Sequence, residues 1–248
     1  MSHWFTQGAS EYLTYRPTYP VQLAQYLASL VPQQKMAVDM GCGNGQFTEL
    51  LHPYFKVTLG MDPSFNQLEY THQKEGLYFY NACAEQIPLK DNSVDLMTAA
   101  QAAHWFQLDR FYREVNRILK PEAVIALISY GVPTIDSFEL NERFKYFYYQ
   151  DIAPYWPAER KLVDEGYQSI PFPFPALPTP SFTYELEWTL SQLIGYITTW
   201  SAFKHAHQQH QDLMLTDFFE DLESIFPDPT ECFIIRWPMN IRAGKVLK

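Results

Sequence analysis

The strongest chemical signal in the sequence is a glycine-rich stretch, VDMGCGNG, at residues 38–45. Glycines allow a backbone to approach a ligand closely, and the helix expected from Gln46 offers free N–H groups at its start. A dinucleotide-binding loop follows the pattern G-x-G-x-x-G, which Gln46 breaks. Asp39 lies two residues before the first glycine, where its charge would repel a diphosphate. A ligand that carries a cationic ammonium or sulfonium group therefore suits this loop better.

Asp62 is the second candidate for ligand binding. It ends the next expected strand, 17 residues beyond Gly45, where a carboxylate can accept hydrogen bonds from two ribose hydroxyls. The alternative interpretation is structural, with Asp39 capping the loop and Asp62 forming a turn beside Pro63. Cys42 also has two interpretations: a nucleophile at a helix N-terminus or, as we expect, a small residue beside the ligand.

Two further groups could act on a second substrate. His104 and Trp105 follow the fourth expected strand, at the edge of the sheet where open α/β folds bind ligands. His104 could orient or deprotonate an acceptor, or it could be a histidine satisfied at a helix entrance, and the sequence leaves both open. Tyr12, Arg16 and Tyr19 could form an N-terminal lid with one fixed cation, or an exposed arm.

A histidine cluster near the C-terminus does not predict a metal site. His205, His207 and His210 are close in sequence, but only the last two share a helical face. No cysteine and no nearby glutamate completes a set of zinc ligands, so we expect no bound metal.

The elements that must position these residues alternate between strand and helix over residues 35–131. Continuous apolar strands separated by helices indicate a parallel sheet covered on both faces. An aromatic segment and five prolines in residues 171–180 then interrupt regular structure. Ser64 and Ser191 are expected to cap two of the helices. Strands are expected at 35–40, 57–61, 77–80, 94–100, 124–129, 182–188 and 231–237, and helices at 64–71, 108–119, 191–203 and 213–226, with the start of another helix at 46–51.

Composition and charge exclude several classes of function. The 248 residues carry a formal net charge of −10, which argues against sequence-independent nucleic-acid binding. No apolar run approaches the ~20 residues that span a bilayer, and the N-terminal residues lack a secretory pattern. Three scattered cysteines fit a reducing compartment. We therefore expect a cytoplasmic protein that binds a small molecule, has no membrane span and binds no nucleic acid. The oligomeric state stays open.

Five motifs occur in order along residues 38–131: VDMGCGNG, MDPS, NACAEQIPLKDNSVDLM, AAHWF and EVNRILKPEAVIALISYG. Together they resemble the successive motifs of class I S-adenosylmethionine-dependent methyltransferases. The resemblance is strongest to the ubiquinone-biosynthesis-type and trans-aconitate-type small-molecule enzymes. YLTYRPTYP at 12–20 and WTLSQLIGYITTWSAF at 188–203 are similar to the latter group.

The resemblance implies a three-layer, Rossmann-like α/β methyltransferase fold. Its sheet would be mostly parallel and seven-stranded, with an antiparallel last strand and an aromatic, proline-rich insertion. One methyltransferase domain would span residues 1–248. It would contain an N-terminal lid or helix (1–30), a donor-binding core (35–131), an insertion or cap over the acceptor site (132–180) and a C-terminal part that completes the sheet (181–248). The implied methyl donor is S-adenosyl-L-methionine.

The same resemblance implies roles for residues around the donor. Cys83 replaces the family's acidic residue before Ala-Glu, so an adenine contact would come from the backbone or from Glu85. The expected donor contacts are Asp39 near the cationic groups, Gly41, Cys42 and Gly43 at the methionine part, Asp62 at the ribose, Pro63, Ala84 and Glu85 near the adenine, and Gln101 at the methionine end.

The acceptor is expected to be a small or medium-sized molecule with a carboxylate or an aromatic group. An aromatic cap suits an apolar body, and an arginine suits an anionic group. Two other classes of function stay open: a non-enzymatic donor-binding protein with this fold, and a nicotinamide-dependent oxidoreductase. The expected acceptor contacts are Tyr12, Arg16, Tyr19, Trp105 and Trp156, with His104 as the catalytic candidate.

Overall fold

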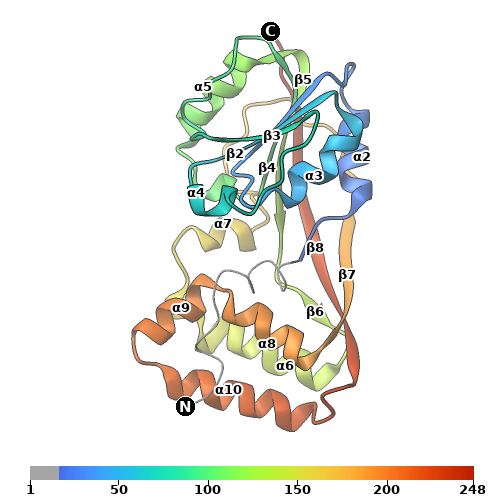
Figure 1. Cartoon of the computed structure of the whole chain (residues 1–248). Helices are drawn as coiled ribbons and strands as arrows, with labels where there is room; N and C mark the ends of the chain where they lie inside the picture. Colours follow the sequence, from blue (N-terminus) through green and yellow to red (C-terminus); the bar gives the residue numbers. More distant parts are fainter. Residues whose placement is uncertain (1–16) are drawn as a thin grey trace. The chain divides into compact units, whose positions relative to one another are not determined.

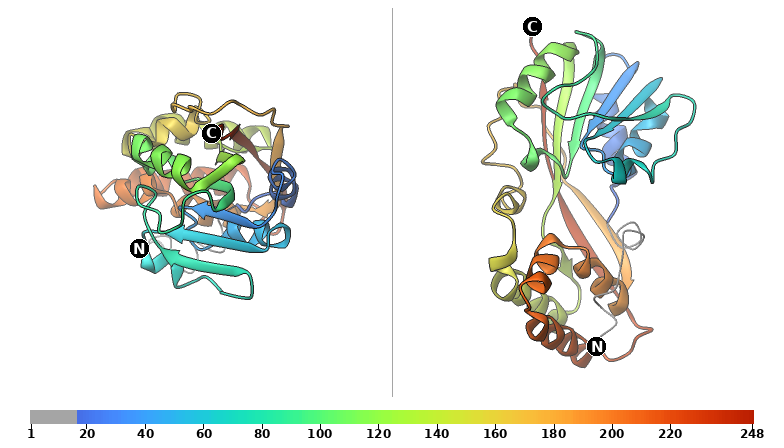
Figure 2. Two further views of the ribbon diagram at one scale, coloured as in Figure 1. Left: turned by 90° about the horizontal axis from the view of Figure 1, so that it is seen from above. Right: turned by 60° about the vertical axis from the view of Figure 1, so that its left-hand side comes forward.

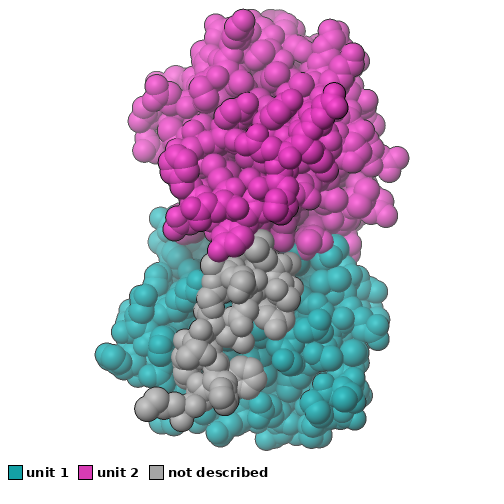
Figure 3. All heavy atoms as spheres, viewed as in Figure 1, with its two compact units in different colours: residues 1–17, 132–160, 184–237 teal, residues 18–131, 161–183, 238–248 magenta. Residues whose placement is uncertain are grey.

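The computed structural model describes residues 17–248, which divide into two compact units (Figure 3). Unit 1 contains Val132–Arg160 and Tyr184–Trp237, and unit 2 contains Thr18–Gly131, Lys161–Thr183 and Pro238–Lys248. The expected donor-binding core, 35–131, lies entirely within unit 2. The expected insertion, 132–180, is divided, because its residues up to 160 belong to unit 1 and the rest to unit 2.

The described residues form an eight-stranded sheet in the order β3-β2-β1-β4-β5-β8-β6, and β7 also pairs with β8. Strands β1 to β5 are parallel, whereas β8 runs antiparallel to β5 and β6 (Figure 1). This arrangement confirms the predicted mostly parallel α/β sheet with an antiparallel last strand. The strands are β1 (Met36–Met40), β2 (Val57–Asp62), β3 (Leu77–Asn81), β4 (Val94–Ala100), β5 (Leu119–Tyr130), β6 (Thr134–Ile135), β7 (Phe182–Thr189) and β8 (Cys232–Lys245).

Burial and register of the central strands explain where a ligand site can form. Nearly every residue of β1, β2 and β4 is buried, as expected for parallel strands covered on both faces. Met40 pairs with Met61 at the ends of β1 and β2. The residues that follow, Gly41 and Asp62, are therefore neighbours at the carboxyl edge of the sheet, where open α/β sheets bind ligands.

The helices of unit 2 cover both faces of its sheet. Figures 1 and 2 show α2 and α3 on one face and α5 on the other. The predicted helix 64–71 is shorter than expected, since α4 spans only four residues and the Ser64 side chain makes no capping hydrogen bond. The bounds are α2 (Val21–Ser29), α3 (Gln46–Leu51), η2 (His52–Tyr54), α4 (Phe65–Leu68), η3 (Ala103–Trp105), α5 (Leu108–Ile118) and α7 (Arg160–Asp164).

Unit 1 is mainly helical and has an aromatic core. Phe147 and Phe218 stack with their ring centroids 3.6 Å apart. The single helix predicted at 191–203 is wrong: the chain forms two helices, and Thr189 with Gln192, rather than Ser191, makes the capping box. Among the described residues, no helix is long and apolar enough to cross a membrane. The helical elements are α6 (Phe138–Tyr146), η4 (Phe147–Asp151), η5 (Ala153–Tyr155), α8 (Leu190–Thr198), α9 (Ser201–Gln208) and α10 (Asp212–Ile225).

Candidate functional site

The glycine-rich loop folds tightly over the end of β2. Gly41, Gly43 and Gly45 have φ angles of +70°, +55° and +88°, which is left-handed backbone that favours glycine. The amides of Gly41 and Cys42 both donate to the carbonyl oxygen of Met61, at 2.7 and 3.1 Å. Gly45 then begins α3 as its N-cap. The loop therefore places its backbone and the start of a helix at the carboxyl edge of the sheet.

The glycines of this loop differ in the space around them. A Cβ atom at Gly41 would lie 2.4 Å from the Cβ of Ala102, so this glycine is required by close packing. Among residues 17–248, and apart from its two neighbours in the chain, a Cβ atom at Gly43 would have only the Oε1 atom of Gln67 within 4 Å, at 3.7 Å. Gly43 thus borders open space, where a ligand can approach the backbone.

Asp62 joins this loop to the end of β2. Its Oδ2 atom accepts a hydrogen bond from the amide of Gly43 at 2.9 Å, and its Oδ1 atom accepts one from the amide of Ser64 at 2.8 Å. An ionised carboxylate has about four lone-pair sites, so each oxygen can still accept a second hydrogen bond. Asp62 can therefore hold the loop and bind a pair of ligand hydroxyls at the same time.

Asp39 lies beneath the loop and is almost fully buried. Thr98 donates its hydroxyl to Oδ1 at 2.7 Å, and Thr48 donates to Oδ2 at 2.8 Å. Burial is the largest cause that raises the pKa of Asp39 to about 6, and these two hydrogen bonds oppose the rise. Because only 1% of its surface is exposed, Asp39 would attract a cationic ligand through the electric field of its carboxylate. Its role in donor binding stays a prediction.

The buried carboxyl predicts a specific dependence of stability on pH. The pKa of Asp39 is about 6 when folded, against an ordinary value of 3.8, so the folded state holds this proton more tightly. The resulting stabilisation is complete below pH ~4 and is lost as the pH rises through 6, by about 3 kcal/mol. Asp39→Asn should escape this loss. Urea unfolding should show the variant gaining about 3 kcal/mol on the wild type between pH 4 and 7.5, and a constant difference would contradict the assignment.

Cys42 and the loop after β3 complete the edge of the site. Burial raises the pKa of the Cys42 thiol, which disfavours the thiolate that a nucleophile needs. Ala84 is buried, and the Oε1 atom of Glu85 accepts a hydrogen bond from the amide of Gln107 at 2.9 Å. Glu85 thereby ties this loop to the segment that follows β4. Cys83 is exposed.

Three residues with unusual features follow β4: Gln101, His104 and Trp105. Gln101 has a φ angle of +53°, and its buried Oε1 atom has no hydrogen-bond partner among the described residues. The Nδ1 atom of His104 lies 2.8 Å from the hydroxyl of Tyr167. Trp105 is 59% exposed, with its ring centroid 4.8 Å from that of His104. An orphaned buried carbonyl and a strained backbone at one sheet edge are typical of a ligand site.

No contact among the described residues brings the remaining expected acceptor-binding residues to this edge of the sheet. Tyr12 and Arg16 lie outside the described residues. Tyr19 is buried in unit 2, with its ring centroid 5.0 Å from that of Phe47. Trp156 belongs to unit 1, where its buried Nε1 atom has no partner among the described residues.

The histidines of α9 have individual partners. The Nδ1 atom of His205 lies 3.1 Å from the carbonyl oxygen of Tyr155, and that of His207 lies 2.5 Å from Oδ1 of Asp212. Within residues 17–248, no three His, Cys, Asp or Glu side chains form a group that could hold a metal ion.

Three functional neighbours could not be predicted from the sequence: Thr48, Thr98 and Tyr167. The threonines are separated by 50 residues, and both donate to the carboxylate of Asp39. Tyr167 reaches His104 across 63 residues. The only local signal was Gly166, which permits the sharp turn that precedes Tyr167.

Comparison with known proteins gives consistent results. Residues 38–127 match the model of a family described as a methyltransferase domain. Over 205 residues the chain is 34% identical to a "putative methyltransferase" of Dictyostelium discoideum. This match covers 80% of this chain and 77% of the Dictyostelium protein. Over 154 residues it is 31% identical to the "probable S-adenosylmethionine-dependent methyltransferase CRG1" of Saccharomyces cerevisiae. That match covers 58% of this chain, and it spans about half of the yeast protein, 53%.

A solved structure is similar along nearly the whole length. The "putative type II methyltransferase" from Anaeromyxobacter dehalogenans has a TM-score of 0.86 and 35% sequence identity to this chain. The similarity covers 94% of this chain and 99% of the other. The similarity in fold and in sequence therefore extends beyond residues 38–127, which match the family model, to nearly the whole chain.

Proposed function

Because the chain belongs to the class I S-adenosylmethionine-dependent methyltransferases, we propose that it methylates a small or medium-sized acceptor bearing a carboxylate or an aromatic group. The chain is an enzyme of this class and uses S-adenosylmethionine as its methyl donor. The observation that carries the proposed donor site is the space that the described residues leave at Gly43. The Gly43 amide donates a hydrogen bond to the Asp62 carboxylate, which fixes the loop there.

The residues of unit 2 fit such a donor in their chemistry. Gly43 leaves room for a chain that carries an ammonium and a carboxylate, since the nearest non-neighbouring atom of the described residues would lie 3.7 Å from a Cβ atom there. The spare lone pairs of Asp62 suit two ribose hydroxyls, and the exposed Pro63 offers an apolar surface beside them. The orphaned Oε1 atom of Gln101 suits an ammonium group. We propose that Ala84 and Glu85 border the adenine.

When bound, the donor supplies a sulfonium methyl group that is already activated for displacement. The protein then has to align the acceptor and exclude water, and an ionised acceptor needs no base. We propose that His104 holds the acceptor group and that Trp105 contacts the acceptor's body. Tyr12, Arg16 and Tyr19 stay part of the proposed acceptor region, together with the segment 132–180, which would set acceptor selectivity. The trans-aconitate-type resemblance favours a carboxylate acceptor.

Trp156 provides a test of acceptor recognition that is separate from folding. Its Nε1 donor is buried without a partner among the described residues, so Trp156→Phe removes no hydrogen bond there. We expect the unfolding free energy to change by less than about 1 kcal/mol, and the KM for the acceptor to rise roughly tenfold. Tyr148→Phe is the control, because it breaks a 2.7 Å bond from Arg160 and should lower stability instead. An unchanged KM in Trp156→Phe would remove this residue from the acceptor site.

Thermal unfolding with ligands tests the proposed donor site. S-adenosylmethionine and its demethylated product should each raise the Tm, whereas NAD should not. A ligand at a hundred times its Kd stabilises the folded state by roughly 2.7 kcal/mol, or about 5–10 °C for a chain of this size. Stabilisation by NAD with none by S-adenosylmethionine would contradict the proposal.

The acceptor class is tested by product formation. Carboxylates, phenols and amines of small size are incubated with the enzyme and S-adenosylmethionine, and the demethylated donor is measured. We expect turnover with carboxylates or aromatic acceptors, and at least tenfold slower turnover in an Asp62→Ala control at a donor concentration below the wild-type Kd. Turnover only with amines that lack both groups would contradict the proposed acceptor class.

A further inference from the structure

Tyr167 has a backbone conformation that bulky residues rarely adopt. Its φ angle is +62°, and Gly166 before it has a φ of +60°, at the end of α7. Left-handed backbone is unfavourable for a residue with a large Cβ substituent, because the side chain crowds the neighbouring carbonyl group. The Tyr167 side chain is nevertheless fully buried. The surrounding structure must therefore hold it in place.

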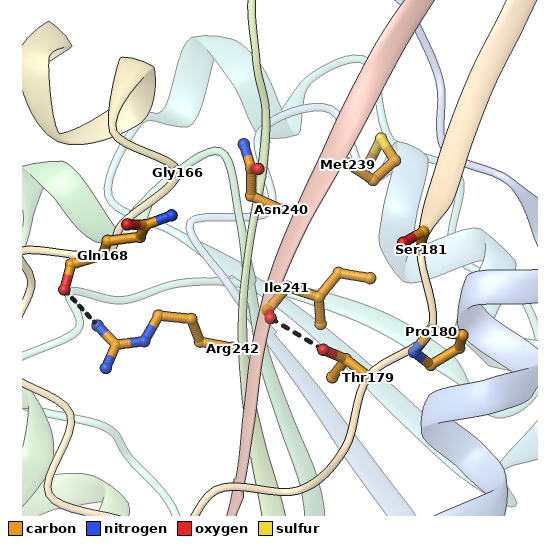
Figure 4. Close-up of a pocket in the computed structure, with 9 residues that line it drawn as sticks. All are labelled: Gly166, Gln168, Thr179, Pro180, Ser181, Met239, Asn240, Ile241 and Arg242. Atoms are coloured by element: carbon orange, nitrogen blue, oxygen red, sulfur yellow. Dashed lines mark hydrogen bonds between the residues drawn. The ribbon is translucent and has the colours of Figure 1, made fainter.

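Arg242 of β8 supplies that restraint. Its Nη1 atom donates to the carbonyl oxygens of Tyr167 at 2.7 Å, Ile170 at 2.5 Å and Gln168 at 3.4 Å. Figure 4 shows the Arg242 side chain reaching toward Gln168, beside the pocket that both residues help to line. The Tyr167 amide also donates to the carbonyl of Leu162 at 2.8 Å. One guanidinium thus binds three carbonyl oxygens within residues 167–170.

This restraint on the backbone fixes the position of the Tyr167 hydroxyl. The Tyr167 oxygen lies 2.8 Å from Nδ1 of His104, and the two ring centroids are 5.9 Å apart. An unprotonated imidazole nitrogen is a stronger acceptor than a phenol oxygen, and a phenol is a good donor. The favoured arrangement therefore has Tyr167 donating to Nδ1, which leaves the proton of the neutral imidazole on Nε2.

Packing alone does not account for this arrangement. The Tyr167 ring belongs to a core cluster with Phe111, Tyr112 and Phe174. Phenylalanine would fill that space equally well, and no packing requirement explains why a hydroxyl meets a histidine at the ligand-binding edge. Backbone strain that persists next to a ligand site points to function.

We propose that Tyr167 is a positioning residue for His104. Its hydroxyl orients the imidazole and fixes the proton on Nε2, so His104 acts as a hydrogen-bond donor toward an anionic acceptor oxygen and not as a general base. This inference rests on the proposed function, in which His104 contacts the acceptor. It narrows the acceptor class to molecules that are already ionised at the atom that His104 binds, such as carboxylates.

The tautomer of His104 can be measured without knowing the acceptor. Two-bond ¹H–¹⁵N correlation spectra of the full-length protein with ¹⁵N-labelled histidine distinguish Nδ1–H from Nε2–H rings, and His104→Gln identifies the signal. We expect a single Nε2–H tautomer in the wild type, and a mixture of tautomers in Tyr167→Phe. A wild-type Nδ1–H tautomer, or identical spectra for wild type and Tyr167→Phe, would overturn the proposal.

A matched variant separates this role from packing. Tyr112 is a tyrosine of the same cluster whose hydroxyl donates to the carbonyl of Pro171 at 2.6 Å. Tyr112→Phe should leave the His104 tautomer as in the wild type, and a tautomer change in this variant would contradict a specific role for Tyr167. Donor binding is measured on every variant. If the wild type does not bind the donor, the proposed function is contradicted. If the wild type binds the donor but His104 is the Nδ1–H tautomer, only the proposed role of Tyr167 is contradicted.

With an acceptor from the product screen, kinetics give a second readout. Tyr167→Phe should lower kcat roughly two- to tenfold, the value of one hydrogen bond, with no change in donor Kd. In a His104→Gln background, Tyr167→Phe should have no further effect on kcat. Independent, additive losses would overturn the proposed coupling.

Discussion

Gly41→Ala is expected to destabilise the fold, whereas Gly43→Ala is expected to weaken donor binding at least tenfold in a protein that still folds. The added methyl group at Gly41 would lie 2.4 Å from the Cβ of Ala102, in left-handed backbone at φ +70°. Overpacking costs about 1–3 kcal/mol, and left-handed strain adds about 1–2 kcal/mol. The loss for Gly41→Ala should therefore be roughly 2–5 kcal/mol in the free energy of unfolding.

Gly43→Ala separates an effect on donor binding from an effect on folding stability. It carries the left-handed strain at φ +55°, but the nearest non-neighbouring atom of the described residues, Oε1 of Gln67, would lie 3.7 Å from the new methyl group. Its cost in stability should be only about 1–2 kcal/mol. The methyl group occupies the space that we propose for the donor, so donor affinity should fall at least tenfold. Urea unfolding and donor titration of both variants check the pair, and normal donor binding by Gly43→Ala would show that the donor lies elsewhere.

Local patterns predicted the central elements because burial on both faces leaves long apolar runs. β4 has the predicted bounds, Val94–Ala100, and α5 ends one residue before the predicted limit. The helix predicted at 64–71 is shorter because its exposed residues gain little from packing. β8 continues to Lys245, beyond the predicted end of this strand at Trp237. Pairing with β5 supplies the hydrogen bonds that a sequence pattern does not show.

The same contrast holds for the site. The glycines and Asp62 were predictable because their spacing relative to strand ends reflects a local turn. The additional short strand β6 consists of two residues, too few for an alternating pattern, and exists through its pairing with Arg236 and Ile235. Tyr167 and the threonines around Asp39 depend on contacts between distant segments, and a single sequence carries no signal for these.

Asp62→Ala is expected to have the largest effect on donor affinity of any substitution that keeps the loop sequence. A carboxylate that accepts from two ribose hydroxyls makes charge-assisted hydrogen bonds worth roughly 1.5–3 kcal/mol. Donor binding should therefore weaken by roughly tenfold to a hundredfold or slightly more. The structure adds a second effect, because the amides of Gly43 and Ser64 lose their acceptor. We expect a further loss of about 1–2 kcal/mol in stability.

A matched carboxylate distinguishes the two effects. Asp95 is also buried, and it accepts hydrogen bonds from the amides of Lys35 and Met36 and from Nζ of Lys120. It lies at the start of β4, beside the start of β1, and so at the opposite edge of the sheet from Asp62. Asp95→Ala should lower stability and leave donor affinity unchanged.

The most direct test of a donor site at Gly43 and Asp62 is calorimetric titration of S-adenosylmethionine into wild type, Asp62→Ala and Asp95→Ala. All three are measured at a temperature where circular dichroism shows them folded. We predict wild-type affinity for Asp95→Ala and a Kd at least tenfold higher for Asp62→Ala. Wild-type donor affinity in folded Asp62→Ala would contradict the assignment of the ribose to this carboxylate, and with it the placement of the donor along the loop from Gly41.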